Sequence, residues 1–201
     1  MKDKKRQSAE KSGQQSSGTP IMDAAAVQRA LRRIAHEIIE RNPDLQSLVL
    51  AGIPSRGVEI AQRIAEFIRT IEHSDNRRDC GIDIATGVID VAMYRDDVGT
   101  RAELPVVRES KLPLPLEGRT VVIVDDVLFT GRTVRAAMDA ISSFGRPARM
   151  QLAVLIDRGH RELPIRADYV GKNLPTRPDE KVRLRLQQTD SEPDAVYLVK
   201  Q

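Results

Sequence analysis

The 201-residue chain is poor in cysteine and has no long apolar segment. Its single cysteine, Cys80, excludes an internal disulfide bond and a cysteine-based zinc site. No apolar run approaches the roughly eighteen residues of a membrane span. The N-terminus is charged and lacks the apolar segment of a secretory signal. We therefore expect a cytoplasmic protein that has no membrane partner.

Aromatic residues are also scarce, since the sequence has three Phe, three Tyr and no Trp. An aromatic platform for stacking nucleic-acid bases is therefore not expected. The formal net charge of +3 belongs to residues 1–20, because the rest of the chain has equal numbers of acidic and basic side chains. These first residues are polar and cannot bury enough apolar surface to fold. We expect a disordered tail over 1–20 and one domain over 21–201.

One stretch combines a buried strand, two carboxylates and a loop of small residues. Val121–Val124 are four consecutive β-branched residues, which predicts a strand buried on both faces. Asp125 and Asp126 follow directly, and a loop around Gly131 then leads into a pattern with helical spacing. Ligands of open α/β sheets bind outside the carboxyl ends of the strands, so this loop is a candidate binding site.

The residue types in this stretch suit a phosphorylated sugar. Backbone N–H groups at the start of a helix bind anions, and the hydroxyls of Thr130 and Thr133 add donors. Gly131 lets the backbone approach a phosphate closely. The two carboxylates cannot bind phosphate, but they suit sugar hydroxyls or a divalent cation. A phosphate beside a polyol describes a ribose 5-phosphate, whereas a turn cap and an ordinary helix start are the structural alternative.

A second strand–loop–helix unit precedes the first in the sequence. Leu48–Ile53 predicts a buried strand, and a helical pattern begins after the loop over 52–57. Arg56 lies in this loop between Ser55 and Gly57, and a guanidinium is a bidentate partner for phosphate oxygens. The alternative is an ordinary turn with a surface arginine.

The first predicted helix has one apolar and one basic side. Asp23 is a plausible N-cap, and the helix ends near Asn42 and Pro43. His36 lies opposite the apolar stripe, and three arginines flank it. This side is either a solvated face or a phosphate-binding surface. Further strands are expected over 87–94, 148–156, 167–171, 182–186 and 196–199, and a long connection runs to residue 115.

The string from Val121 to Thr133 resembles the phosphoribosyl pyrophosphate (PRPP) motif of the type I phosphoribosyltransferases. Three further strings, 29–42, 93–97 and 157–169, are similar to the PyrR family of bifunctional pyrimidine-operon regulators and uracil phosphoribosyltransferases. The resemblance runs from Ile21 to the C-terminus, and Pro54 departs from the family pattern. It implies an α/β fold with a central, mainly parallel sheet flanked by helices, a small hood and a flexible active-site loop.

This resemblance implies that uracil and PRPP give UMP and pyrophosphate, with Mg²⁺ as cofactor. Arg56, Asp125 and Asp126 are then the catalytic residues, and the two aspartates meet the metal, directly or through substrate and water. A non-proline cis peptide is expected at Ser55–Arg56. The PRPP-binding set implied by the resemblance is Ser55, Arg56, Gly57, Arg95, Asp125, Asp126, Thr130, Gly131, Arg132 and Thr133.

The resemblance also implies a uracil pocket and an RNA surface. Asp157 and the backbone of Val170 are the candidate uracil contacts, and Tyr169 is either part of this hood or a core aromatic. The family binds pyrimidine-operon mRNA when uridine nucleotides (UMP, UTP) are abundant, and homodimers or higher homo-oligomers are expected. Two alternatives are a nucleotide sensor with little catalysis and a phosphoribosyltransferase for another base. The candidate RNA contacts are Arg32, His36, Arg41, Arg161, Arg166 and Lys172.

Overall fold

A computed structural model describes residues 18–74, 83–92 and 109–200. Its centre is a five-stranded sheet in the order β3-β2-β4-β5-β6, in which every neighbouring pair is parallel. The sequence-based expectation of a mainly parallel sheet is thereby confirmed. The strands are β2 (Leu48–Gly52), β3 (Ala85–Val88), β4 (Thr120–Leu128), β5 (Arg149–Asp157) and β6 (Tyr169–Asn173).

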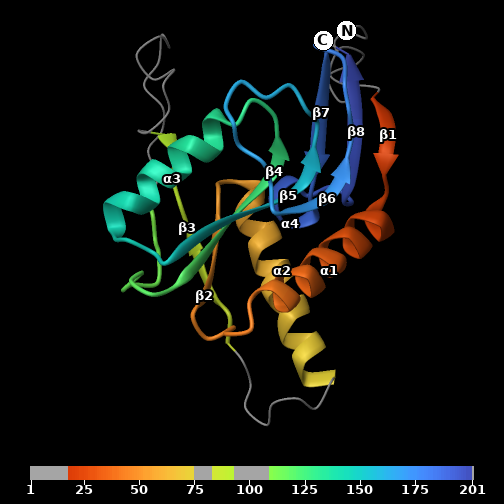
Figure 1. The fold of residues 1–201 in the computed structure, drawn as a ribbon. Helices are drawn as coiled ribbons and strands as arrows, with labels where there is room; N and C mark the ends of the chain where they lie inside the picture. Colours follow the sequence, from red (N-terminus) through yellow and green to blue (C-terminus); the bar gives the residue numbers. More distant parts are fainter. Residues whose placement is uncertain (1–17, 75–82, 93–108, 201) are drawn as a thin grey trace, which may run out of the picture.

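Helices cover both faces of this sheet (Figure 1). On one face, α1 (Ala24–Arg41) and α2 (Arg56–Ser74) pack on alternate strand residues such as Leu48 and Leu50. On the other face, α3 (Arg132–Phe144) packs on the residues between them, such as Val49. Successive strand side chains point to opposite faces, so strands that are apolar throughout supply two cores at once.

The first helix forms as its sequence predicts. Asp23 Oδ1 accepts a hydrogen bond from the backbone N–H of Ala26 at 2.7 Å, which is the geometry of an N-cap. Asn42 ends the helix, and both its backbone N–H and its side-chain amide donate to the carbonyl of Ile38. The apolar stripe predicted for this helix is buried. Among the helices of the described segments, none is long and apolar enough to cross a membrane.

A second, antiparallel sheet stands beside the first and was not expected in this form. It has the order β1-β8-β7 and consists of β1 (Thr19–Met22), β7 (Glu180–Arg185) and β8 (Ala195–Lys200). The short helix α4 (Gln187–Asp190) connects β7 to β8. The expected end of the tail at residue 20 falls inside β1, because pairing with β8 orders Thr19 and Pro20. Residues 1–17 lie outside the described part of the chain.

Two strand ends differ most from the sequence-based prediction, and the other boundaries shift by one or two residues. β3 ends at Val88 instead of residue 94, because Asp90 Oδ1 accepts from the N–H of Ala92 and turns the chain. β4 extends past Val124 to Leu128 and includes both aspartates, because β5 continues to pair with it as far as Asp157. The carboxylates therefore project from the last part of a strand and do not follow it in a loop.

Candidate active site at the carboxyl edge of the sheet

The two strand–loop–helix units meet because their strands are neighbours. Gly52 pairs with Val124 in parallel register, and the N–H of Ile53 donates to the carbonyl of Val124 at 2.9 Å. A Cβ built on Gly57 would lie only 2.4 Å from that same carbonyl oxygen. The first turn of α2 thus lies directly against Val124, just before the two aspartates of β4, and only a glycine permits this approach. This contact places Arg56 beside the two carboxylates.

The carboxylates differ in exposure. Asp125 is 8% exposed, whereas Asp126 is half-buried. Each accepts a hydrogen bond at 2.8 Å from the N–H of the residue that follows it. The Asp190 hydrogen bond raises the pKa of the Arg56 guanidinium, burial opposes this rise, and the charge of Asp126 contributes to it. The charges of Arg56 and Asp126 therefore act on each other at this edge of the sheet.

The loop after β4 begins α3 without a side-chain cap. Gly131 has a φ of 93°, a left-handed conformation that only glycine adopts without strain. Thr130 Oγ1 accepts a long hydrogen bond of 3.4 Å from the N–H of Arg132. The Arg132 side chain instead reaches Glu162, with Nε 2.7 Å from Oε2. Backbone N–H groups and the hydroxyls of Thr130 and Thr133 are therefore the anion donors that this loop offers, and the Arg132 guanidinium has another partner.

The loop after β2 holds a non-proline cis peptide, as expected, but at a different bond. It joins Pro54 to Ser55, whereas the prediction was Ser55–Arg56. Neither bond precedes a proline, so nothing in the sequence distinguishes them. The guanidinium of Arg56 makes a bidentate ion pair with Asp190, at 3.0 Å from Nε and 2.7 Å from Nη2. Sequence reasoning missed Asp190, because α4 approaches this loop from far along the chain.

Asp157 and Arg161, assigned above to uracil and to RNA, bind each other. Asp157 also accepts from the N–H of Gly159 at 3.0 Å. Arg161 donates to the carbonyls of Phe129 at 2.7 Å and Ile165 at 3.0 Å. These bonds brace the loop after β4 from behind and occupy both side chains. In the structure Asp157 and Arg161 therefore support the loop after β4, and their assignment to uracil and RNA stays a prediction.

A stacked cluster that the sequence analysis missed supports the same loop. The guanidinium of Arg158 lies 4.1 Å from the ring centroid of Phe129, and the ring of His160 packs edge-on at 6.0 Å. Burial lowers the pKa of Arg158, and its Nη2 donates to the carbonyl of Glu180 at 2.6 Å. Phe129 lies in the stretch Val121–Thr133, and Arg158 and His160 lie in the stretch 157–169. Only the fold brings the two stretches together.

The second candidate uracil contact, Val170, lies on the edge strand β6. Its carbonyl accepts a hydrogen bond from Arg33 Nη2 at 3.0 Å, and the next carbonyl, of Gly171, accepts from the same nitrogen at 2.6 Å. Tyr169 is fully buried, and its hydroxyl bonds to Asn42 and Gln151. Burial raises the pKa of this hydroxyl. Tyr169 is therefore a core aromatic.

The remaining RNA candidates are exposed and lie on α1, on β6 and in the loop before β6. Arg32 and His36 lie on α1, whereas Arg166 and Lys172 lie before and within β6. Arg41 is partly engaged, because it donates to the carbonyl of Asp168 at 3.2 Å and stacks on Tyr169.

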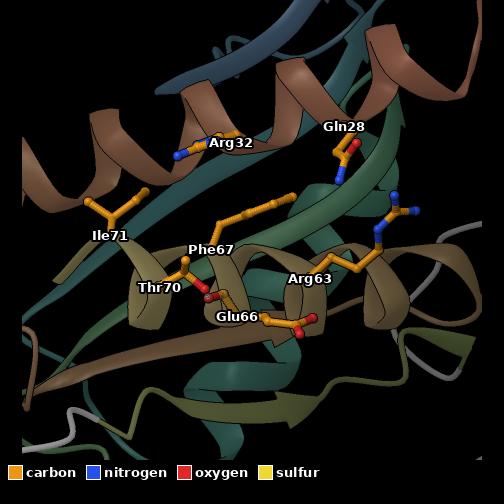
Figure 2. Close-up of a pocket in the computed structure, with 7 residues that line it drawn as sticks. All are labelled: Gln28, Arg32, Arg63, Glu66, Phe67, Thr70 and Ile71. Carbon is orange, nitrogen blue, oxygen red and sulfur yellow. Dashed lines mark hydrogen bonds between the residues drawn. The ribbon is translucent and has the colours of Figure 1, made fainter. Parts of the chain in front are cut away.

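Arg32 also lies at a pocket between α1 and α2, of about 260 Å³. Figure 2 shows that Gln28 and Arg32 reach it from α1 and that Arg63 and Phe67 reach it from α2. Apart from Arg32, its lining contains no residue of the predicted PRPP, uracil or RNA sets. Arg95 and residues 93–108 of the expected flexible loop lie outside the described residues, whereas Lys111, near the end of that loop, pairs with Val88.

The two carboxylates fit a magnesium ion that takes its other ligands from outside the protein. Within the segments that the structure describes, no group of three His, Cys, Asp or Glu side chains forms a metal site. Asp125 and Asp126 supply two carboxylates at the end of β4. Mg²⁺ keeps several waters and commonly binds through one or two carboxylates plus substrate phosphates. These two residues fit such a partial site.

Comparisons with known proteins agree on the fold and on the family. A model of the phosphoribosyl transferase domain matches residues 17–186. The "Bifunctional protein PyrR" of Roseiflexus sp. (strain RS-1) is 53% identical over 180 residues, which cover 90% of this chain and 94% of that protein. The protein of the same name from Chloroflexus aurantiacus is 57% identical over 178 residues, covering 89% and 93%.

Solved structures of similar shape are more distant in sequence. A hypoxanthine-guanine phosphoribosyltransferase from Bacillus anthracis superposes with a TM-score of 0.65 at 14% identity, covering 90% of this chain and 97% of that one. The hypoxanthine phosphoribosyltransferase of Trypanosoma cruzi gives a TM-score of 0.66 at 19% identity, covering 92% and 97%. At these identities the likeness establishes the fold alone.

Proposed function

This chain belongs to the PyrR family of bifunctional phosphoribosyltransferases, and we propose that it performs both activities that this membership implies. It transfers the phosphoribosyl group of PRPP to uracil, which gives UMP and pyrophosphate. It also binds pyrimidine-operon mRNA in response to uridine nucleotides. The cytoplasmic location and the homo-oligomer stay predictions.

One observation carries the catalytic half of the proposal. The parallel pairing of Gly52 with Val124 brings a loop with a fixed cation beside a strand end with two carboxylates and an anion-binding helix start. A substrate that has a pyrophosphate, a ribose and a 5-phosphate matches these three features in their spatial order. The Arg56 guanidinium meets the pyrophosphate, the carboxylates meet the ribose, and the loop before α3 meets the 5-phosphate.

The transfer forms a bond from uracil N1 to the ribose C1. It breaks the bond from C1 to the pyrophosphate oxygen and the N1–H bond of uracil, whose proton is released to water. The reacting sugar gains positive character, which the charges of Asp125 and Asp126 stabilise, and the leaving pyrophosphate keeps the electron pair. The Arg56 guanidinium stabilises the negative charge of that leaving group. Binding of the 5-phosphate at Thr130–Thr133 holds the reacting carbon in place. Mg²⁺, when bound through Asp125 and Asp126 and the substrate, supplies further charge stabilisation to the pyrophosphate.

The regulatory half uses the exposed basic side chains on α1 and around β6. Arg32, His36, Arg166 and Lys172 are exposed and can meet phosphates of a structured RNA. Because binding by arginine and lysine releases counterions, the affinity falls as salt rises. The same nucleotide is the product at the active site and the effector for RNA binding, which links the two activities.

The decisive experiment is PRPP-dependent turnover of labelled uracil with Mg²⁺, with hypoxanthine, guanine and orotate as competitors. The proposal expects UMP formation that unlabelled uracil suppresses and the other three bases do not. Turnover of a purine would contradict the substrate assignment. A folded protein that binds UMP and turns over no base would instead be a nucleotide sensor.

A further inference from the structure

We propose that Asp190 is a positioning residue of the pyrophosphate loop, which fixes one edge of the Arg56 guanidinium so that its other edge meets the leaving pyrophosphate. The proposal rests on the proposed function, because it concerns the side chain assigned to the pyrophosphate. It adds a residue from the C-terminal segment to a site that otherwise comes from β2, β4 and the loops that follow them.

The contact uses one edge of the guanidinium. Asp190 accepts from Nε and from Nη2 of Arg56, which are the two donors of the same side of this planar group. The second N–H of Nη2 and both N–H groups of Nη1 remain, and within the described part of the chain Nη1 has no hydrogen-bond partner. A second bidentate contact, to two phosphate oxygens, therefore fits without displacing Asp190.

Asp190 is itself held firmly. Its Oδ2 accepts from the N–H of Leu186 at 2.9 Å, and its own N–H donates to the Leu186 carbonyl at 2.7 Å. Burial disfavours its charged form, but the bonds from Arg56 and Leu186 outweigh this effect and keep the pKa of the carboxyl below its ordinary value. The charged Asp190 carboxylate is thus held in place, and it restricts the rotamers of the Arg56 side chain, which is 34% exposed.

Contacts with the next turns of α2 hold the segment between β7 and β8, which contains Asp190, in its position. Glu59 Oε2 accepts from both the N–H and the hydroxyl of Thr189, at 3.0 and 2.8 Å. Farther along the same side of the helix, Arg63 pairs with Asp194 at 2.6 Å. The segment between β7 and β8 thus docks on α2 through Asp190, Thr189 and Asp194, and α4 lies beside α2 (Figure 1). Of these three residues, only Asp190 contacts Arg56.

The test compares Asp190→Asn with a matched control, Asp194→Asn. Both variants neutralise one carboxylate of the same segment that pairs with an arginine of α2. We measure the KM for PRPP, the KM for pyrophosphate in the reverse reaction, and the affinity for UMP. The proposal expects Asp190→Asn to raise both KM values about tenfold, the scale of one charged hydrogen bond. UMP affinity stays unchanged, because UMP carries no pyrophosphate, and Asp194→Asn leaves all three within about twofold.

Several results would overturn the proposal. Equal effects of the two variants, or weaker UMP binding by Asp190→Asn, would show that Asp190 only holds the segment in place. Tighter pyrophosphate binding by Asp190→Asn would show that Asp190 competes with pyrophosphate for Arg56. In an Arg56→Lys background, Asp190→Asn should change KM far less, because lysine cannot make the bidentate contact, so additive effects would also contradict the proposal.

Two further measurements keep the test decisive. Should Asp190→Asn fail to fold, Asp190→Glu keeps the charge but displaces it by one methylene, and the same selective loss for pyrophosphate over UMP is expected. Calorimetric binding of Mg²⁺-pyrophosphate reads the contact without turnover. It therefore separates a failure of this inference from a wild-type protein that does not use uracil.

Discussion

Gly57 gives the sharpest prediction, because its role follows from one distance. In Gly57→Ala, the new Cβ would lie 2.4 Å from the carbonyl oxygen of Val124, and the two atoms must separate by at least about 0.6 Å to reach the shortest contact that such atoms show. Both sides of the contact are backbone, and the Val124 carbonyl is also held by the N–H of Ile53. The strand end and the helix must therefore move apart.

The expected effect on stability is modest and the effect on activity is large. Overpacking costs about 2 kcal/mol, and the better helix propensity of alanine offsets about 0.8 kcal/mol of it. A net loss near 1 kcal/mol lowers Tm by about 2–4 °C in a domain of this size. The displacement, however, separates Arg56 from Asp125 and Asp126, and a misplacement of this order costs about ten- to a hundredfold in turnover. The assays are a thermal melt and PRPP-dependent UMP formation.

Gly118→Ala is the matched control. Gly118 precedes β4 at its opposite end, has a φ of 75°, and its new Cβ would meet no atom within 4 Å. Left-handed strain alone costs about 1 kcal/mol, so this variant should melt like Gly57→Ala but keep wild-type turnover. Wild-type turnover by Gly57→Ala would refute the close-approach argument. An equal loss of turnover in both variants would attribute the effect to stability instead.

Three further predictions concern charge. Asp126→Asn should lose at least about tenfold in turnover, because one charge that stabilises the sugar is gone, and a filter-binding assay should show normal RNA affinity. The pair Arg32→Glu and His36→Ala should do the reverse, with weaker RNA binding and a shallower salt dependence; unchanged RNA affinity would contradict the α1 surface. The folded-state pKa of Asp190 lies below its ordinary value, so its ion pair with Arg56 stabilises the fold at neutral pH and is lost as the pH falls through that lowered pKa. The free energy of unfolding in urea should therefore drop more in the wild type than in Asp190→Asn when the pH falls from about 6 to about 3, the range in which aspartate titrates.

The sequence predicted the two central units well because their signals are local. Four consecutive β-branched residues before Asp125 and the Asp23 cap each depend on neighbours within a few positions. Parallel pairing of the two strands then follows from the fold class, and it places both loops at one edge. The side chains proposed to lie nearest the reacting atoms were therefore accessible to sequence reasoning.

The support of those side chains was not accessible in this way. Arg56 meets Asp190 across 134 positions, and Arg161 reaches back to Phe129 across 32. No periodicity or spacing predicts such pairs, because they depend on where the antiparallel sheet docks and how the chain turns after β5. Asp157 and Arg161 lie only four positions apart, and their pair was missed for another reason: the turn after β5 that joins them is not helical.

Helix α1 joins the two surfaces proposed for the two activities. Arg32 and His36 face solvent, while the adjacent Arg33 donates to the carbonyls of Val170 and Gly171 on β6, the strand proposed to meet the base. A carbonyl oxygen has two lone pairs, so a base that bonds to Val170 shares this acceptor with Arg33. Any preference of the nucleotide for one position of β6 then acts on α1 through two direct hydrogen bonds. These hydrogen bonds are sufficient to couple the binding of the uridine nucleotide to the binding of RNA. Two ligands strengthen each other's binding when both favour the same arrangement of one shared element, which here is α1.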